Sequence, residues 1–414
     1  MPRCHYFLSV NAIEKALKWI AALAALAGII GSAAALFLWA LDAATHRRFE
    51  NPWLIYLLPL AGIAMGFYYR HLGKNTSSGN HTILGSLHKE HDVVPIVLAP
   101  SIVIATLATH LFGGSAGREG TAVQMGAAIG SNIGKFVAKT RDAWNLMMFC
   151  GIAAGFGAVF GTPFAGAVFA LEFTRHRIFS RKLIACLLAA LAANQVCHAW
   201  GIVHTPYPAI HLASSMTYWI PIAWKLALGA AVFGLASRFF LLASHFTARK
   251  FREWLPHEAV RGAMGGVIVV GLFLLVGTGD YLGLGVLAEH KNSLTLPRLF
   301  AADLHAPETA WLWKLAFTII TLSAGFKGGE VTPLLFIGAA LGNSLAGYLH
   351  APIELFVGVG MIAFFASSTK TPFASIIMGM ELLGSEMSLP LVFCTLIATK
   401  LSGSKSVFPQ VDDL

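Results

Sequence analysis

Four consecutive residues, Gly117, Arg118, Glu119 and Gly120, place two charges at the start of a run of small and apolar side chains. A helix that begins after a glycine turn leaves its first backbone N–H groups unpaired and points the positive end of its dipole at whatever lies before it. Such an end binds anions without a formal positive charge and still lets them leave. We therefore expect Gly117, Arg118 and Gly120 to contribute to an anion site.

Glu119 is the residue of this stretch whose charge can change. As a carboxylate it would occupy the anion site as a tethered anion; once protonated it would lose that attraction and move away. This exchange would couple a proton to the passage of an anion. The simpler interpretations of Glu119 are an ion pair with Arg118 or a helix cap, but a charged residue inside a membrane is a functional candidate by default.

The chain repeats this pattern in its second half. GIAAGFGAVFGTPFAGAVFALE at 151–172 matches GMIAFFASSTKTPFASIIMGME at 360–381 at a constant offset, and GGEVT at 328–332 echoes the glutamate stretch. Two homologous halves are typical of secondary transporters, whose ligands bind between the repeats. Glu330 is the counterpart of Glu119, so we consider it a second proton-handling group, with a cap or buried polar residue as the alternative.

The elements that carry these residues lie in a membrane, because 56% of the side chains are hydrophobic and only 12% are charged. Some apolar runs reach the roughly 20 residues that span a bilayer, while others are too short and must end inside the protein. The chain is therefore predicted to be an all-α polytopic membrane protein, with a retained transmembrane helix from Trp19. The apolar runs are 19–42, 52–68, 93–112, 143–174, 183–203, 217–246, 264–287, 309–325, 331–348, 351–366 and 388–399.

The net charge of +9 does not indicate nucleic-acid binding here, because the basic residues lie between apolar runs. The clusters at 47–48, 175–182 and 249–252 are interpreted as positive-inside and lipid-headgroup contacts. The 5 cysteines and 16 histidines show no ligand spacing. We expect no metal and no cofactor.

GREGTAVQMG at 117–126, GGEVTP at 328–333 and the TPFAG and TPFAS pair resemble motifs of the CLC anion channel and transporter family. The resemblance covers roughly residues 19–410 and is closest to the fluoride-exporting branch. Thr121 stands where chloride-type members have proline, and Glu330 belongs to the branch's own variant of the second motif.

The resemblance implies a two-repeat, inverted-topology fold with broken half-helices. It also implies a homodimer with one pore in each subunit, multi-pass in the cell (inner) membrane. On this basis residues 1–18 are an N-terminal cytoplasmic segment, 19–205 and 206–410 are the two repeats of the transport domain, and 411–414 are a short tail.

Carried over residue by residue, the resemblance makes Glu119 the gating glutamate and places Val331 and Thr332 at the central anion site. Asn80, in GNHTI at 79–83, matches the position of a serine that contacts the anion in chloride-type relatives. The alternative for Asn80 is an ordinary N-cap, a position that asparagine favours.

Two positions depart from the family pattern. Phe408 replaces the tyrosine of the inner anion gate, which removes a hydroxyl donor. The anion would then be held by backbone N–H groups with Asn80 and Thr332, or by the aromatic edge of Phe408, unless Phe408 only packs in the core. Phe173, next to Glu172, takes the place of a cytoplasmic proton-path glutamate, as is common in the fluoride branch.

Together these residues predict a fluoride/proton antiporter that exports fluoride which entered as HF. Fluoride is small and strongly hydrated, so its site needs several close hydrogen-bond donors. The alternatives within the family are a chloride/proton exchanger and a passive anion channel.

Two further features have other interpretations. GGSAG at 113–117 places Ser115 in a G-x-S-x-G pattern near His110, which leaves a remote alternative of an intramembrane serine hydrolase. Glu172 and Glu381 end apolar segments and are predicted to be interface or capping carboxylates.

Overall fold

The computed structural model describes residues 10–71, 73, 76, 79–88, 93–212 and 215–408. Among these residues the chain is helical, and its one β-type contact is an isolated bridge between Gly117 and Gly329. Three short 3₁₀ helices, at Pro52–Leu57, Arg298–Phe300 and Ser385–Met387, lie between α-helices. The α-helices are α1 (Val10–Glu50), α2 (Leu58–His71), α3 (Asn80–His88), α4 (Leu98–Leu111), α5 (Glu119–Val137), α6 (Arg141–Phe160), α7 (Pro163–Phe173), α8 (Arg181–Ala199), α9 (Met216–Trp254), α10 (Glu258–Val276), α11 (Ala310–Ser323), α12 (Val331–Leu349), α13 (Ile353–Thr369), α14 (Pro372–Leu383) and α15 (Ser388–Leu401).

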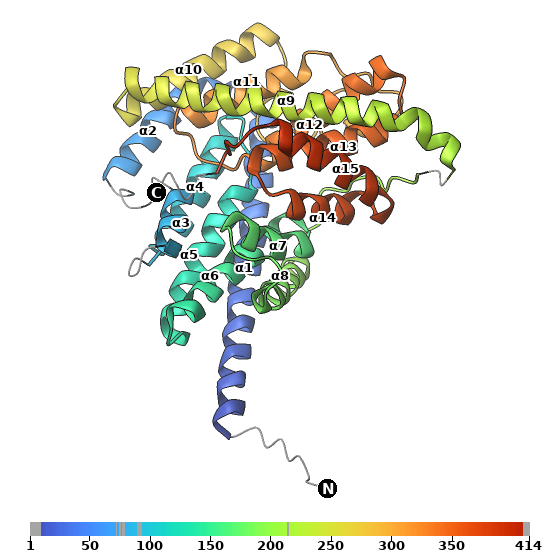
Figure 1. Cartoon of the computed structure of the whole chain (residues 1–414). Helices are drawn as coiled ribbons and strands as arrows, with labels where there is room; N and C mark the ends of the chain where they lie inside the picture. Colours follow the sequence, from blue (N-terminus) through green and yellow to red (C-terminus); the bar gives the residue numbers. More distant parts are fainter. Residues whose placement is uncertain are drawn as a thin grey trace.

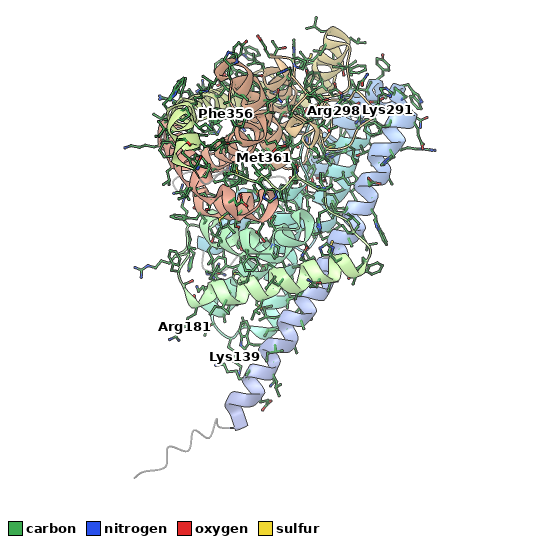
Figure 2. The ribbon with its side chains drawn as sticks, turned by 90° about the vertical axis from the view of Figure 1, so that its right-hand side faces the viewer. Lys139, Arg181, Lys291, Arg298, Phe356 and Met361 are labelled. Carbon is green, nitrogen blue, oxygen red and sulfur yellow. The ribbon has the colours of Figure 1, made fainter. Side chains whose placement is uncertain are left out.

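Seven helical segments of the described chain are long and apolar enough to cross a membrane, while α4, α7, α11, α13 and α14 are apolar but shorter. The prediction of a polytopic membrane protein with broken half-helices is thus confirmed. Figure 2 shows Lys139 and Arg181 near the start of α1, whereas Lys291, Arg298, Phe356 and Met361 lie in the other half of the molecule. The seven segments are Glu14–Glu50, Pro52–His71, Arg141–Phe160, Arg181–Ala199, Thr217–Trp254, Glu258–Val276 and Val331–Leu349.

The order of helices α4 to α7 recurs as α11 to α14. Their lengths are 14, 19, 20 and 11 residues in the first half and 14, 19, 17 and 12 in the second. In Figure 1 the first set forms the lower half of the molecule and the second set the upper half, with α9 packed across α11, α13 and α15. The Gly117–Gly329 bridge is antiparallel, so the halves run in opposite directions where they meet.

Glycines bring the central helices of each half together. A Cβ atom on Gly126 of α5 would collide with the carbonyl oxygen of Gly151 of α6, and Gly338 of α12 meets Gly360 of α13 in the same way. Small residues are the usual means by which helices approach closely inside lipid, where burial of apolar surface gives little driving force. These four glycines therefore set the distance between the helices that carry the repeat motifs.

Helices α7 and α14 cap one another. Glu172, near the end of α7, accepts hydrogen bonds from the N–H groups of Phe373 and Ala374 at 3.1 and 2.8 Å. Glu381, near the end of α14, accepts from Phe164 and Ala165 at 3.1 and 2.7 Å. Both glutamates are therefore helix caps, as predicted, and these caps join the two repeats.

Two apolar runs do not form continuous helices. The run 143–174 divides into α6 and α7 because Gly161 takes the left-handed conformation, with φ 79°, and Pro163 starts a new helix. Within the run 264–287 the helix ends at Val276, and the next residue, Gly277, has φ 73°. The rest of the run is an irregular connection.

The basic pair 47–48 was predicted to contact lipid headgroups, and for Arg48 this is wrong. Arg47 has a side chain that is 71% exposed, whereas Arg48 is 6% exposed. Adjacent residues of a helix face different sides, so one residue of the pair reaches solvent while the other enters the protein.

Candidate functional site

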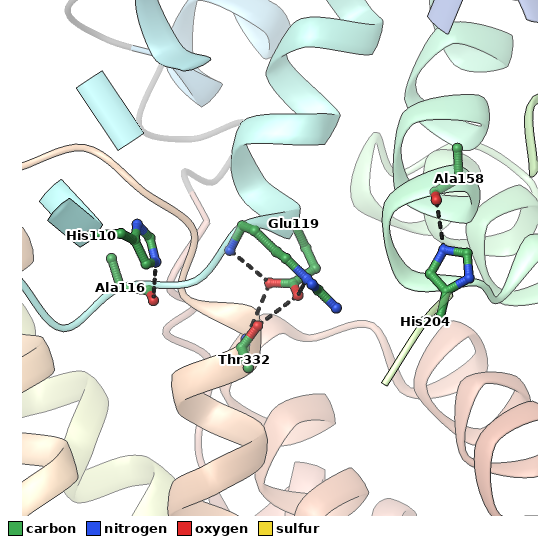
Figure 3. A network of polar contacts seen from close by, with 7 residues as sticks. His110, Ala116, Glu119, Ala158, His204 and Thr332 are labelled. Carbon is green, nitrogen blue, oxygen red and sulfur yellow. Dashed lines mark hydrogen bonds and ion pairs between the residues drawn. The ribbon is translucent and has the colours of Figure 1, made fainter. Parts of the chain in front are cut away.

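The carboxylate of Glu119 lies at the centre of the molecule, against the start of the helix from the other repeat (Figure 3). Glu119 is the first residue of α5 and is fully buried. The Thr332 hydroxyl donates to Glu119 Oε1 at 2.6 Å, and the Thr332 N–H donates to Oε2 at 3.3 Å. The Arg118 N–H also donates to Oε2, at 3.1 Å. A negative group therefore occupies the point where the N-termini of α5 and α12 meet.

Glycine allows the two helix starts to approach. Gly117 and Gly329 exchange backbone hydrogen bonds of 2.5 and 2.7 Å, which close the bridge between the repeats. A Cβ on Gly120 would lie 2.9 Å from the Cα of Gly329, and one on Gly117 would lie 2.9 Å from Glu119 Oε2. Larger residues at these positions would push the carboxylate and the facing turn apart.

Arg118 interacts with Glu119 and with an open cavity. Its Nε lies 3.5 Å from Glu119 Oε1, and its side chain is 15% exposed. The ion pair considered from the sequence is therefore present, together with the contacts to Thr332. Arg118 also lines a cavity of about 440 Å³ with Asp42 and His204. No motif pointed to His204, which comes from the distant 202–212 connection.

Glu330 and Val331 stand at the start of α12. Val331 is the first helical residue and is 1% exposed. Glu330 precedes it and makes no side-chain capping bond, so the cap interpretation is not realised. Glu330 instead lines a larger cavity, of about 890 Å³, together with Phe408. Glu119 lines neither cavity and is fully buried, while its neighbour Arg118 lines the smaller one and Glu330 the larger one.

Phe408 both packs in the core and faces the larger cavity. It is 6% exposed and meets Phe169 and Phe173 edge to face, with ring centroids 5.9 and 5.0 Å apart. Its N–H donates to Ser406 Oγ at 3.1 Å. The two departures from the family pattern, Phe173 and Phe408, thus touch each other.

Asn80 is the first residue of α3, a short helix that packs against α5. Its Oδ1 is buried without a hydrogen-bond partner, so the alternative interpretation of Asn80 as an N-cap is not realised. Gln124 of α5, which sequence reasoning missed, also has a buried oxygen without a partner, and its amide lies against Gly79. The signal in the sequence was an amide side chain within the small and apolar stretch 120–130.

The structure brings together Gly117, Arg118, Glu119, Gly120 and Thr332. In the described part of the chain, no hydrogen bond joins these five residues to the side chains of Asn80, Glu330 or Phe408. Of these three, Glu330 and Phe408 line the larger cavity.

The serine hydrolase arrangement is not formed. Ser115 Oγ lies 3.0 Å from Thr318 Oγ1, while the two ring nitrogens of His110 face the carbonyl oxygens of Thr106 and Ala116 at 2.8 and 3.0 Å. No base therefore reaches the serine hydroxyl. Among the described residues, no group of three or more His, Cys, Asp or Glu could hold a metal ion.

Comparisons with known proteins agree on one family. The family model for voltage gated chloride channels matches residues 60–403. A chloride/fluoride channel protein of Pseudomonas syringae pv. tomato is 39% identical over 395 residues, covering 94% of this chain and 85% of the relative. The crystal structure of a CLC-type fluoride/proton antiporter has a TM-score of 0.86 at 30% identity, covering 97% of this chain and 98% of that one. A slow cyanobacterial Cl⁻/H⁺ antiporter has the same fold, with a TM-score of 0.79 at 20% identity, covering 93% and 94%.

Proposed function

The chain belongs to the voltage-gated chloride channel family, and from this membership and the surroundings of Glu119 we propose that it is a fluoride/proton antiporter. The observation that carries the proposal is the position of the Glu119 carboxylate, bound by the hydroxyl and the N–H of Thr332. A carboxylate held by donors at two helix starts marks a place where an anion is stabilised.

Protonation of Glu119 would remove the charge that these donors bind. A neutral carboxyl accepts hydrogen bonds less strongly and no longer interacts with the dipoles of α5 and α12. A fluoride ion then takes the donors that the carboxylate leaves. The Glu119 carboxylate and fluoride thus occupy these donors in alternation. Because the carboxylate leaves only when it gains a proton and returns only when it loses one, the movements of proton and anion are coupled.

The two cavities supply the routes to this site. The larger cavity is lined by Arg249, Arg252 and Lys405, whose positive charges attract an anion toward Glu330 and Phe408. We assign Glu330 to proton handling on this side because a half-buried carboxylate there exchanges protons with water in the cavity. The smaller cavity leads to Arg118 on the opposite side of Glu119.

The remaining site residues complete the fluoride path. We propose that Asn80 and Val331, with the backbone of Gly117, Arg118 and Gly120, line the anion route, and that Phe408 narrows its inner end. The unpaired Asn80 amide supports this, because a buried polar group without a partner needs a ligand or water.

The similarity to known proteins favours fluoride over chloride as the transported anion. A chloride/fluoride channel protein and a CLC-type fluoride/proton antiporter are 39% and 30% identical to this chain, whereas the Cl⁻/H⁺ antiporter is 20% identical. We propose further that residues 19–205 and 206–410 are the two repeats of the transport domain, and that the protein is a homodimer in the cell (inner) membrane.

The test compares wild type with Glu119→Gln in proteoliposomes, with fluoride and chloride electrodes and a pH-sensitive dye read together. Wild type should release fluoride, take up protons in return and largely exclude chloride. Glu119→Gln should lose proton movement, because an amide cannot exchange a proton. Comparable chloride release by wild type would favour the exchanger or channel, and fluoride-driven proton uptake by the variant would reject the role of Glu119.

A further inference from the structure

The carboxylate of Glu330 borders the start of α5. A Cβ on Gly120 would lie 3.7 Å from Glu330 Oε2, and Gly120 directly follows Glu119 in the chain. Glu330 is therefore placed to exchange protons with the region of Glu119. A proton that reaches Glu330 must still travel to the aqueous phase.

The larger cavity opposes the passage of a proton. Arg249, Arg252 and Lys405 line it together with Glu330. A positive lining attracts an anion, but it raises the energy of a proton that water carries through the same space. A way out that avoids this lining would keep the proton apart from the anion.

A third cavity, of about 130 Å³, lies next to the larger one. Residues 322–323, at the end of α11, line the larger cavity, whereas residues 324–327 line the third. Its other walls are α2 and the start of α10, whose backbones approach closely: a Cβ on Gly66 of α2 would collide with the backbone of Glu258 and Ala259. A water molecule takes up about 30 Å³, so the third cavity holds about four.

Lys327 links the third cavity to Glu330. It lines the cavity, and its Nζ lies 4.5 Å from the centre of the Tyr69 ring. It also interacts electrostatically with both Glu258 and Glu330. An amine between two carboxylates takes a proton from one and gives it to the other, provided that it can lose its own proton, as lysine can and arginine cannot.

Glu258 links the third cavity to the membrane surface. It is the first residue of α10, a helix that crosses the membrane, and its neighbour His257 is exposed. Its Oε2 is buried and has no hydrogen-bond partner among the described residues, so water in the cavity would be its donor. Arg261, one turn further along α10, is its other positive neighbour besides Lys327. Two carboxylates and two cations thus accompany the cavity, and no net charge opposes a proton there.

We propose that Lys327 and Glu258 form an inner proton route that is separate from the path of the anion. Protonated Glu330 gives its proton to the neutral amine of Lys327, which leaves a carboxylate and an ammonium. The ammonium passes a proton through the water of the third cavity to the Glu258 carboxylate. Glu258 then releases the proton at the membrane face that the basic residues 249–252 mark as cytoplasmic. The route rests on the proposed antiport function.

The test measures proton uptake and fluoride release together in proteoliposomes that contain Glu258→Gln. The number of protons moved per fluoride should fall by roughly tenfold or more, because an amide does not relay the proton and a positioned side chain speeds proton transfer by at least this factor. Fluoride release down its own gradient should continue, since the Glu119 site is unaltered, and it shows that the variant is folded. Glu258→Asp keeps a carboxylate and should retain most of the coupling. Glu253→Gln, which removes an exposed carboxylate near the end of α9 that pairs with Lys250 at 2.8 Å, is the matched control and should behave as wild type.

Lys327→Arg separates a proton relay from a fixed charge. Arginine keeps the positive charge but does not give up its proton, so this variant should lose coupling as Glu258→Gln does. Coupling at the wild-type ratio in Lys327→Arg or in Glu258→Gln would overturn the route and show that protons leave through the larger cavity. A wild type that releases fluoride without taking up protons would instead reject the antiport function, and the route with it.

Discussion

Thr332 links the two repeats through hydrogen bonds to Glu119. Its hydroxyl and its N–H both hold the Glu119 carboxylate, and both are buried with it. The same donors are proposed to receive fluoride, so carboxylate and anion compete for one residue. A change at Thr332 therefore affects whichever species is bound there.

Replacing Thr332 by valine should weaken fluoride binding by about tenfold or more, because a hydrogen bond to a charged group contributes roughly 1.5–3 kcal/mol. The measurement is titration calorimetry with fluoride in a Glu119→Ala background, where no carboxylate competes. Thr332→Ser keeps the hydroxyl and should bind nearly as well as the background. Equal affinity in the valine and serine variants would remove the Thr332 hydroxyl from the site.

At the scale of elements, helix ends meet across the repeats. The start of α12 holds the start of α5 through Glu119, and α7 and α14 cap one another through Glu172 and Glu381. A helix that ends inside a membrane protein leaves N–H groups that water cannot reach, so each start needs an acceptor. Carboxylates from the opposite repeat supply these acceptors.

Replacing Glu172 by alanine should lower the free energy of unfolding by about 0.5–2 kcal/mol, the usual cost of a lost helix cap. The N–H groups of Phe373 and Ala374 then have no acceptor. Thermal unfolding of purified protein in detergent measures the effect. Glu354→Ala removes an exposed carboxylate from the first turn of α13 and should change the midpoint less. Equal midpoints for the two variants would show that the cap contributes nothing.

For the whole molecule, the proposed homodimer requires a surface that lipid does not cover. Helices α7, α8, α14 and α15 pack in a continuous series. Their outer side exposes large apolar side chains, including Ile184 at 64%, Leu188 at 56% and Leu389 at 80%. We propose this side as the contact between subunits, with the Glu119 site enclosed within each chain.

Replacing both Ile184 and Leu389 by tryptophan should convert the dimer to a monomer, because oversized side chains separate closely packed helices. Light scattering after size-exclusion chromatography in detergent measures the mass. Leu275→Trp, on the 72% exposed side chain of α10, is the control and should stay dimeric. The monomeric variant should keep its fluoride flux per chain. A wild type of monomer mass would refute the dimer.

Much of this arrangement could be predicted from the sequence. The repeated motifs predicted a ligand site between the two halves, and the family resemblance placed Glu119 and Thr332 at it. The class of fold followed from the apolar runs. The break at Gly161 was missed because a left-handed glycine followed by proline interrupts a run whose hydropathy is continuous.

Burial of polar residues was harder to predict. Arg48 looked like a membrane-surface residue because a sequence shows a charge and its neighbours but not the side of the helix that is covered. His204 lines the smaller cavity from the 202–212 connection, and nothing local to it indicates that position. Gln124 lies against Gly79, and its amide in an apolar stretch gave no indication of which segment it would contact. Such contacts depend on the packing of distant segments.

Coupling of fluoride to protons is tested most directly by asking whether a proton gradient drives net fluoride movement when no fluoride gradient is present. Proteoliposomes with equal fluoride on both sides are given an inward proton gradient, with the membrane potential clamped by potassium and valinomycin. Net fluoride efflux is expected in wild type, and none in Glu119→Gln. Fluoride that remains at equilibrium in wild type under the proton gradient, while flowing down a fluoride gradient, would mean that the protein is a channel and that Glu119 does not couple the two ions.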